Sequence, residues 1–143
     1  MPELTADQAF QLALAFKDIA NKLEDYRFTN WDAMTPDQRT KLEGLEWTVR
    51  NYSSDFNALS IKLTLDDLDG TLENIKQATD QMKSAIKNLE KIDKIIKIAT
   101  SAVTIGAAIV SGNPAAIASA IGSALAPEDD KDKDKAKDKN KDA

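Results

Sequence analysis

Residues 98–126 read IATSAVTIGAAIVSGNPAAIASAIGSALA and contain no charged residue, although 30% of the 143 residues in the chain are charged. A segment this apolar must be hidden from water, because exposing it forfeits about 25 cal/mol for each Å² of apolar surface. Three environments can hide it: the core of the protein's own fold, the surface of a partner, or a lipid bilayer. Both fold and function depend on which of the three the segment occupies.

The middle of this segment predicts a break between two helices. Gly112 suits the cap that ends a helix, Asn113 suits the N-cap of the next one, and Pro114 suits its first position. The break leaves pieces of roughly 13 and 12 residues, each about 20 Å long as a helix. A bilayer core is about 30 Å thick, so a permanent transmembrane helix is not expected. We expect a sheltered helical hairpin.

Three amphipathic helices are predicted upstream, over residues of about 6–27 and 36–63 and in a long third helix that begins between Leu65 and Thr71. Apolar residues recur in steps of three and four along each, which draws one stripe on a helix. Capping boxes at Thr5–Gln8 and Thr35–Gln38 mark the first two starts. The third helix is expected to become apolar on all sides near Ile95 and to end at Ser111. The stripes comprise Leu12, Phe16, Ile19, Leu23 and Tyr26; Leu42, Leu45, Val49, Tyr52, Phe56, Leu59 and Leu63; and Leu68, Leu72, Ile75, Met82, Ile86, Leu89 and Ile96.

These patterns predict an all-α fold: an antiparallel helical bundle of about four helices with a short apolar C-terminal helical hairpin. The bundle is expected to span residues 1–127 as one domain. Residues 128–143 alternate acids with lysines and contain no aliphatic side chain larger than alanine, which predicts a disordered tail. In the connection after the first helix, Phe28, Trp31 and Met34 are expected to cover the end of the bundle.

The composition argues against catalysis. The chain has no cysteine and no histidine, so a thiolate nucleophile, the commonest general base and the commonest transition-metal ligand are missing. The carboxylate pair Glu43 and Glu46 is expected on a solvated helix face, and the DLDG sequence at 67–70 lacks two key ligands of a calcium loop. We therefore predict no enzyme, no catalytic residue, no metal site and no cofactor.

Charge and the N-terminal sequence narrow the partners and the location. The chain carries 17 acids and 13 bases up to residue 127, which does not favour nucleic-acid binding. The first ten residues, MPELTADQAF, lack a basic region followed by an apolar one, so no secretory signal is expected. The localisation stays open between the cytoplasm and export by a leaderless route.

Two functional hypotheses follow for the uncharged segment, beside simple burial in the bundle. In the first, the hairpin of residues 98–126 associates with another helical protein or with a second copy. In the second, it enters a membrane conditionally, and Lys91, Lys94 and Lys97 form a collar for anionic headgroups; the simpler interpretation of these lysines is a solvated helix face. The hairpin residues predicted to make the contact are Ile98, Val103, Ile105, Ile109, Val110, Ile117, Ile121 and Leu125.

From Leu65 to Ala126, the placement of one Ala/Gly/Ile-rich hairpin on a cysteine-free heptad bundle resembles the helical pore-forming toxins of bacteria, of the haemolysin E and haemolysin BL type. That resemblance implies an apolar tongue that stays folded against the bundle until it meets a membrane. It rests on composition and placement, so no site residue is carried over from it. With its lysine–aspartate tail, the chain also looks like a small bacterial protein.

Overall fold

The computed structural model describes residues 5–58, 68–88 and 91–125, and all the regular structure within them is helical. The all-α prediction is therefore confirmed. The described residues form five α-helices rather than the four main helices expected, together with one 3-10 turn. The elements are α1 Ala6–Thr29, η1 Trp31–Ala33, α2 Pro36–Ala58, α3 Leu68–Lys87, α4 Ile92–Ser111 and α5 Pro114–Leu125.

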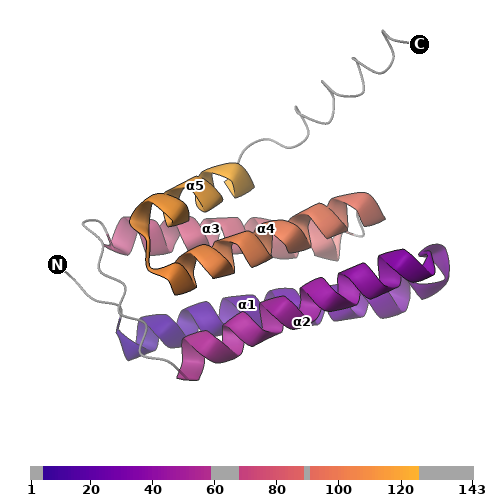
Figure 1. The fold of residues 1–143 in the computed structure, drawn as a ribbon, viewed down its shortest axis with the longest axis horizontal. Coiled ribbons are helices and arrows are strands. Elements are labelled where there is room, and N and C mark those ends of the chain that lie inside the picture. Colours follow the sequence, from indigo (N-terminus) through magenta and orange to yellow (C-terminus); the bar gives the residue numbers. More distant parts are fainter. Residues whose placement is uncertain (1–4, 59–67, 89–90, 126–143) are drawn as a thin grey trace, which may run out of the picture.

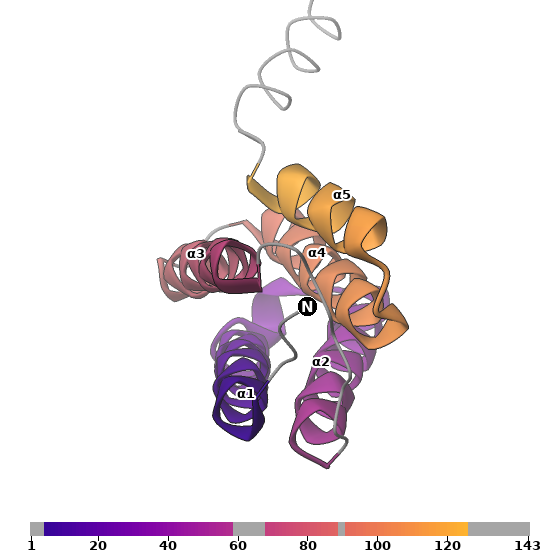
Figure 2. The ribbon, with the colours of Figure 1, turned by 90° about the vertical axis from the view of Figure 1, so that its left-hand side faces the viewer.

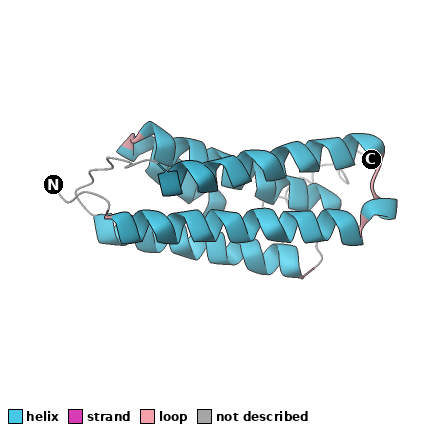
Figure 3. Ribbon diagram, turned by 90° about the horizontal axis from the view of Figure 1, so that it is seen from below, coloured by secondary structure: helices cyan, strands magenta, loops and turns pink. Residues whose placement is uncertain are grey.

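The helices lie in layers. α1 and α2 lie side by side in one layer, α3 and α4 lie above them, and α5 covers α4 and α3 on the side away from α1 and α2 (Figures 1 and 2). Seen from below, the long helices run roughly along one another (Figure 3). α1 packs most extensively on α2, α2 packs on α4, and α1 packs on α3. The core lies where these four helices meet, and buried residues of α5 extend it.

The predicted apolar stripes form that core. In α1 every stripe residue is buried, and in α2 the ring of Phe56 meets the ring of Phe16 edge to face, with centroids 5.1 Å apart. Aromatic rings prefer this arrangement to a face-to-face stack. The buried stripe residues are Leu12, Phe16, Ile19, Leu23, Tyr26, Leu42, Val49, Phe56, Ile75, Met82 and Ile86.

Both predicted capping boxes are confirmed. The Gln8 amide donates to Thr5 Oγ1 at 3.1 Å, and the Thr5 amide donates to Gln8 Oε1 at 2.9 Å. Thr35 and Gln38 make the same reciprocal pair at 2.9 and 3.2 Å. Each box satisfies two backbone donors that the first turn of a helix leaves open, which fixes where α1 and α2 begin.

The long third helix is the largest difference from the prediction. α3 ends at Lys87 and a separate helix, α4, begins at Ile92, whereas α4 runs unbroken through Thr100. One helix over residues 68–111 would be about 66 Å long, roughly twice the length of α1 or α2. Its uncharged C-terminal part, residues 98–111, would project beyond the bundle into water. Reversal of the chain between Lys87 and Ile92 returns that part to the core.

Two further expectations have mixed or open outcomes. Met34 is buried, but Phe28 and Trp31 stack on each other with centroids 6.5 Å apart and stay exposed, so the prediction that all three cover the bundle end is wrong for these two. The expected end of the second helix, residues 59–63, lies outside the described residues. So does the predicted disordered tail at 128–143.

Candidate interaction surface

The break at Gly112 is built as predicted. Gly112 has a φ of 69°, the left-handed conformation that glycine adopts without a steric penalty, and its amide donates to the carbonyl of Ile109 at 3.1 Å. The side-chain oxygen of Asn113 accepts from the amides of Ala115 at 2.9 Å and Ala116 at 3.3 Å. One helix therefore ends and the next begins within three residues, which folds α5 back onto α4.

The hairpin turns most of its large aliphatic side chains inward. Ile105 and Ile109 of α4 are completely buried. In α5, Ile117 and Ile121 are also buried, with 1% and 6% of their surface exposed. Ile98 and Val103 are half-buried against the same core. Val110 differs from these residues, because 44% of its surface is exposed. The side chain of the last predicted contact residue, Leu125, lies outside the described residues.

A close helix contact holds α4 against α2. A Cβ atom added at Gly106 would lie 2.5 Å from Cδ2 of Tyr52, closer than such atoms approach one another. Only glycine lets the α4 backbone rest on this ring. Ala102 and Ala99, one and two turns earlier in α4, are also fully buried. Small residues at these positions let the backbones of two helices approach closely.

The outward side of the hairpin is uncharged and built mostly from small residues. Every residue from Ile98 to the end of α5 lacks a charge, so the exposed surface of this region is neutral. We call this surface the hairpin outer face. Its exposed residues are Thr100, Thr104, Ala107, Val110 and Ser111 of α4, Asn113 of the connection, and Pro114, Ala115, Ala118, Ser119, Gly122 and Ser123 of α5.

The predicted lysine collar lies at the far end of α4 from the hairpin turn. Lys91 is the N-cap residue of α4 and is exposed; Lys94 is half-buried and Lys97 is exposed, both within the first two turns. Lys94 and Lys97 each take part in an interaction within the protein. The exposed carboxylate of Asp93 lies among them and offsets part of their charge.

A buried ion network joins α1 and α2 and was not predicted from the sequence. Arg27 donates to Glu46 Oε1 at 3.1 Å, and Arg50 contacts Glu46 Oε2 at 3.2 Å and Glu24 at 3.0 Å. The Glu46 side chain is only 2% exposed, so its expected place on a solvated face is wrong, whereas the Glu43 side chain is 51% exposed. Both carboxylate oxygens of Glu46 accept from guanidinium groups, which is a structural arrangement that joins two helices.

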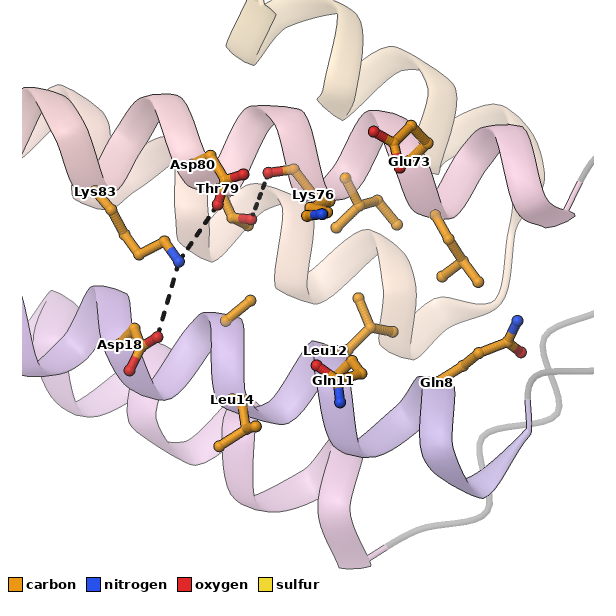
Figure 4. Close-up of a pocket in the computed structure, with 13 residues that line it drawn as sticks. Gln8, Gln11, Leu12, Leu14, Asp18, Glu73, Lys76, Thr79, Asp80 and Lys83 are labelled. Carbon is orange, nitrogen blue, oxygen red and sulfur yellow. Dashed lines mark hydrogen bonds and ion pairs between the residues drawn. The ribbon is translucent and has the colours of Figure 1, made fainter.

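Burial raises the pKa of the Tyr26 hydroxyl. A groove of about 530 Å³ runs between α1 and α3, with an apolar floor that includes Leu12 and Ile75. Across its rim Lys83 pairs with Asp18 at 3.8 Å and with Asp80 at 3.4 Å (Figure 4).

Within the described residues, no group of three or more acidic side chains is placed to hold a metal ion.

Comparisons with protein-family models, with curated proteins and with solved structures gave no match. By length and composition, α4 is the one described helix that is long and apolar enough to cross a membrane, and core helices of water-soluble proteins meet the same criterion.

Proposed function

We propose that this protein is an antiparallel helical bundle with a non-enzymatic role, and that the hairpin outer face associates with another helical protein or with a second copy. The observation that supports the proposal is the absence of charge across this face in a chain of which 30% is charged. Depletion of charged residues is the compositional feature that separates the centre of a protein interface from the rest of a surface.

The side chains on this face favour a helical partner. Ala107, Ala118 and Gly122 are exposed and small, so a second helix can approach the backbone of α4 or α5 closely. Val110 adds a larger exposed apolar side chain beside them. The residues proposed to touch the partner are therefore the small exposed ones and Val110. Ile105 and Ile109, which were predicted to make the contact, lie in the core beneath them.

Conditional membrane insertion is the second candidate, and the composition of α4 is the observation that favours it. If the hairpin entered a bilayer turn first, Lys91, Lys94 and Lys97 would remain near the headgroups. Insertion would require Ile105 and Ile109 to leave the core, at about 1.5–3 kcal/mol for each side chain before lipid repays it. α5 would reach only about 18 Å.

Site-specific photo-crosslinking tests the proposal. A photoreactive residue at Ser119, in the cells that make the protein, should give a discrete product with a helical protein or with a second copy. Ala118→Arg should abolish that product, because it adds a charge to the face, while Thr40→Arg on the exposed side of α2 should leave it unchanged. Absence of any product that Ala118→Arg removes would contradict the proposal.

Vesicle flotation separates the membrane candidate from the protein candidate. The unmodified chain should remain with the soluble fraction when mixed with vesicles containing anionic lipid. Flotation that disappears in a Lys91→Glu/Lys97→Glu variant would instead support insertion with the lysine collar at the headgroups.

A further inference from the structure

The outer face of α1 carries an apolar stripe separate from the one that builds the core. Phe10 is 46% exposed and Leu14 is 38% exposed, one turn apart on the same side of the helix. Asp7 precedes Phe10 by three residues and Lys17 follows Leu14 by three, so all four side chains lie along one line. We call these four residues the α1 outer stripe.

A concave surface adjoins this stripe. A groove of about 310 Å³ lies between α1 and α2 and is bordered by Phe10, Leu14 and Lys17 on one side and by Arg50 and Ser54 on the other. Leu14 also borders the α1/α3 groove, on the edge away from α3 (Figure 4). Leu14 therefore lies between the α1/α3 groove and the α1/α2 groove. The two helices that border this groove, α1 and α2, lie on the side of the bundle away from α5 (Figure 2).

We propose that the α1 outer stripe is the contact of a symmetric dimer, in which α1 packs antiparallel on α1 of a second copy. A two-fold axis midway between Phe10 and Leu14 brings each Phe10 against Leu14 of the other copy. It also brings each Asp7 against Lys17 of the other copy. Each Phe10 then lies over the groove between α1 and α2, where an apolar ring gains most from leaving water.

The order of the charges along the α1 outer stripe favours a second copy as the partner and an antiparallel orientation of its α1. The stripe has a negative end at Asp7 and a positive end at Lys17, so an antiparallel copy joins opposite charges, whereas a parallel copy would join like charges. Neither side chain takes part in an ion pair within the described part of the chain. A second copy therefore supplies two ion pairs as well as the apolar contact. The dimer leaves the hairpin outer face of each copy uncovered.

Sedimentation equilibrium of the full chain tests the dimer. We expect a reversible monomer–dimer equilibrium that Leu14→Glu abolishes. Lys17→Glu should raise the dissociation constant about tenfold, because it replaces two attractions with two repulsions of exposed charges. Lys41→Glu is the control: it makes the same change of charge at an exposed site on α2 and should leave the dissociation constant unchanged.

The charge swap gives the sharpest result. Asp7→Lys alone should weaken the dimer as Lys17→Glu does, and the double variant Asp7→Lys/Lys17→Glu should restore it to within about threefold. Far-UV circular dichroism of each variant checks that α1 is still folded. The proposal is overturned if the chain is monomeric at every concentration, if the double variant stays as weak as the single ones, or if Ala118→Arg on α5 removes the dimer.

Discussion

The α1–α2 half and the α4–α5 half of this molecule are built by different means. α1 and α2 are joined by charged side chains: Arg27 and Arg50 hold Glu46 from both sides in a buried network. α4 and α5 have no charge beyond Lys97, and close packing such as that of Gly106 on Tyr52 fixes their position.

The two halves fix the alignment of their helices in different ways. A buried ion pair restricts how two helices can align, because sliding one of them leaves a charge without its partner. Small apolar residues specify position less strictly, since many registers bury similar areas. The left-handed cap at Gly112 and the close approach at Gly106 supply the missing specificity in the second half. Substitutions in the two halves should therefore fail for different reasons.

Ile105→Asp should have the largest effect. Ile105 is completely buried, and an unpaired carboxylate there should lower the free energy of unfolding by about 4 kcal/mol or more. Thr104→Asp is the matched control on the neighbouring exposed position and should change it by less than about 0.5 kcal/mol. Urea unfolding followed by circular dichroism measures both. Equal, small effects would mean that the hairpin is not part of the core.

Glu46→Ala should be the next largest. It removes the shared partner of Arg27 and Arg50 and leaves Arg27 buried, which should cost about 3 kcal/mol of unfolding free energy. Glu43→Ala removes only the half-exposed partner of Arg27 and should cost about 0.5 kcal/mol. Denaturant midpoints of the two variants test the difference. A Glu43→Ala variant as unstable as Glu46→Ala would show that the network depends on total charge rather than on burial.

Gly106→Ala tests the packing that fixes α4. The added methyl group meets the ring of Tyr52, so we expect a loss of about 1–3 kcal/mol. Gly44→Ala is the same substitution in α2 with no neighbouring atom within 4 Å, and it should stabilise the protein by about 0.5–1 kcal/mol. Thermal unfolding of the pair should move in opposite directions. A stabilised Gly106→Ala variant would refute the close contact.

Ala118→Arg should have the smallest effect on stability. Although it places a charge in the uncharged segment, residue 118 is exposed, so the unfolding free energy should change by less than about 0.5 kcal/mol. Chemical denaturation checks this before the variant is used in crosslinking. A loss similar to that of Ile105→Asp would show that the hairpin outer face is buried.

Local patterns were sufficient to predict most of the fold. The 3-4 apolar spacing of α1, the reciprocal Thr5–Gln8 cap and the Gly112–Pro114 break are each fixed by neighbours within one or two turns, and each is confirmed. The reversal between Lys87 and Ile92 was not predicted, because the heptad spacing continues across it. Only the length of the other helices makes a continuous rod unfavourable, and that is a property of the whole fold.

The candidate surface was predicted only as a segment. The aliphatic residues named for contact were chosen by hydrophobicity, which does not distinguish a residue facing the core from one facing solvent once a helix is apolar all round. Ile105 and Val110 therefore looked equivalent, but only Val110 is exposed. The ion network had a weak signal: Arg27 and Glu46 each follow a buried leucine by four residues, at the edge of an apolar stripe.

Hydrogen–deuterium exchange of the full chain, resolved by residue, tests the central claim most directly. The claim is that α4 is an integral part of the core despite its membrane-like composition. Amides around Ile105 and Ile109 should then exchange only by global unfolding, with the same free energy as those around Phe16 in α1. Exchange of α4 and α5 at a lower free energy, while α1 stays protected, would show that the hairpin opens on its own and would contradict the claim.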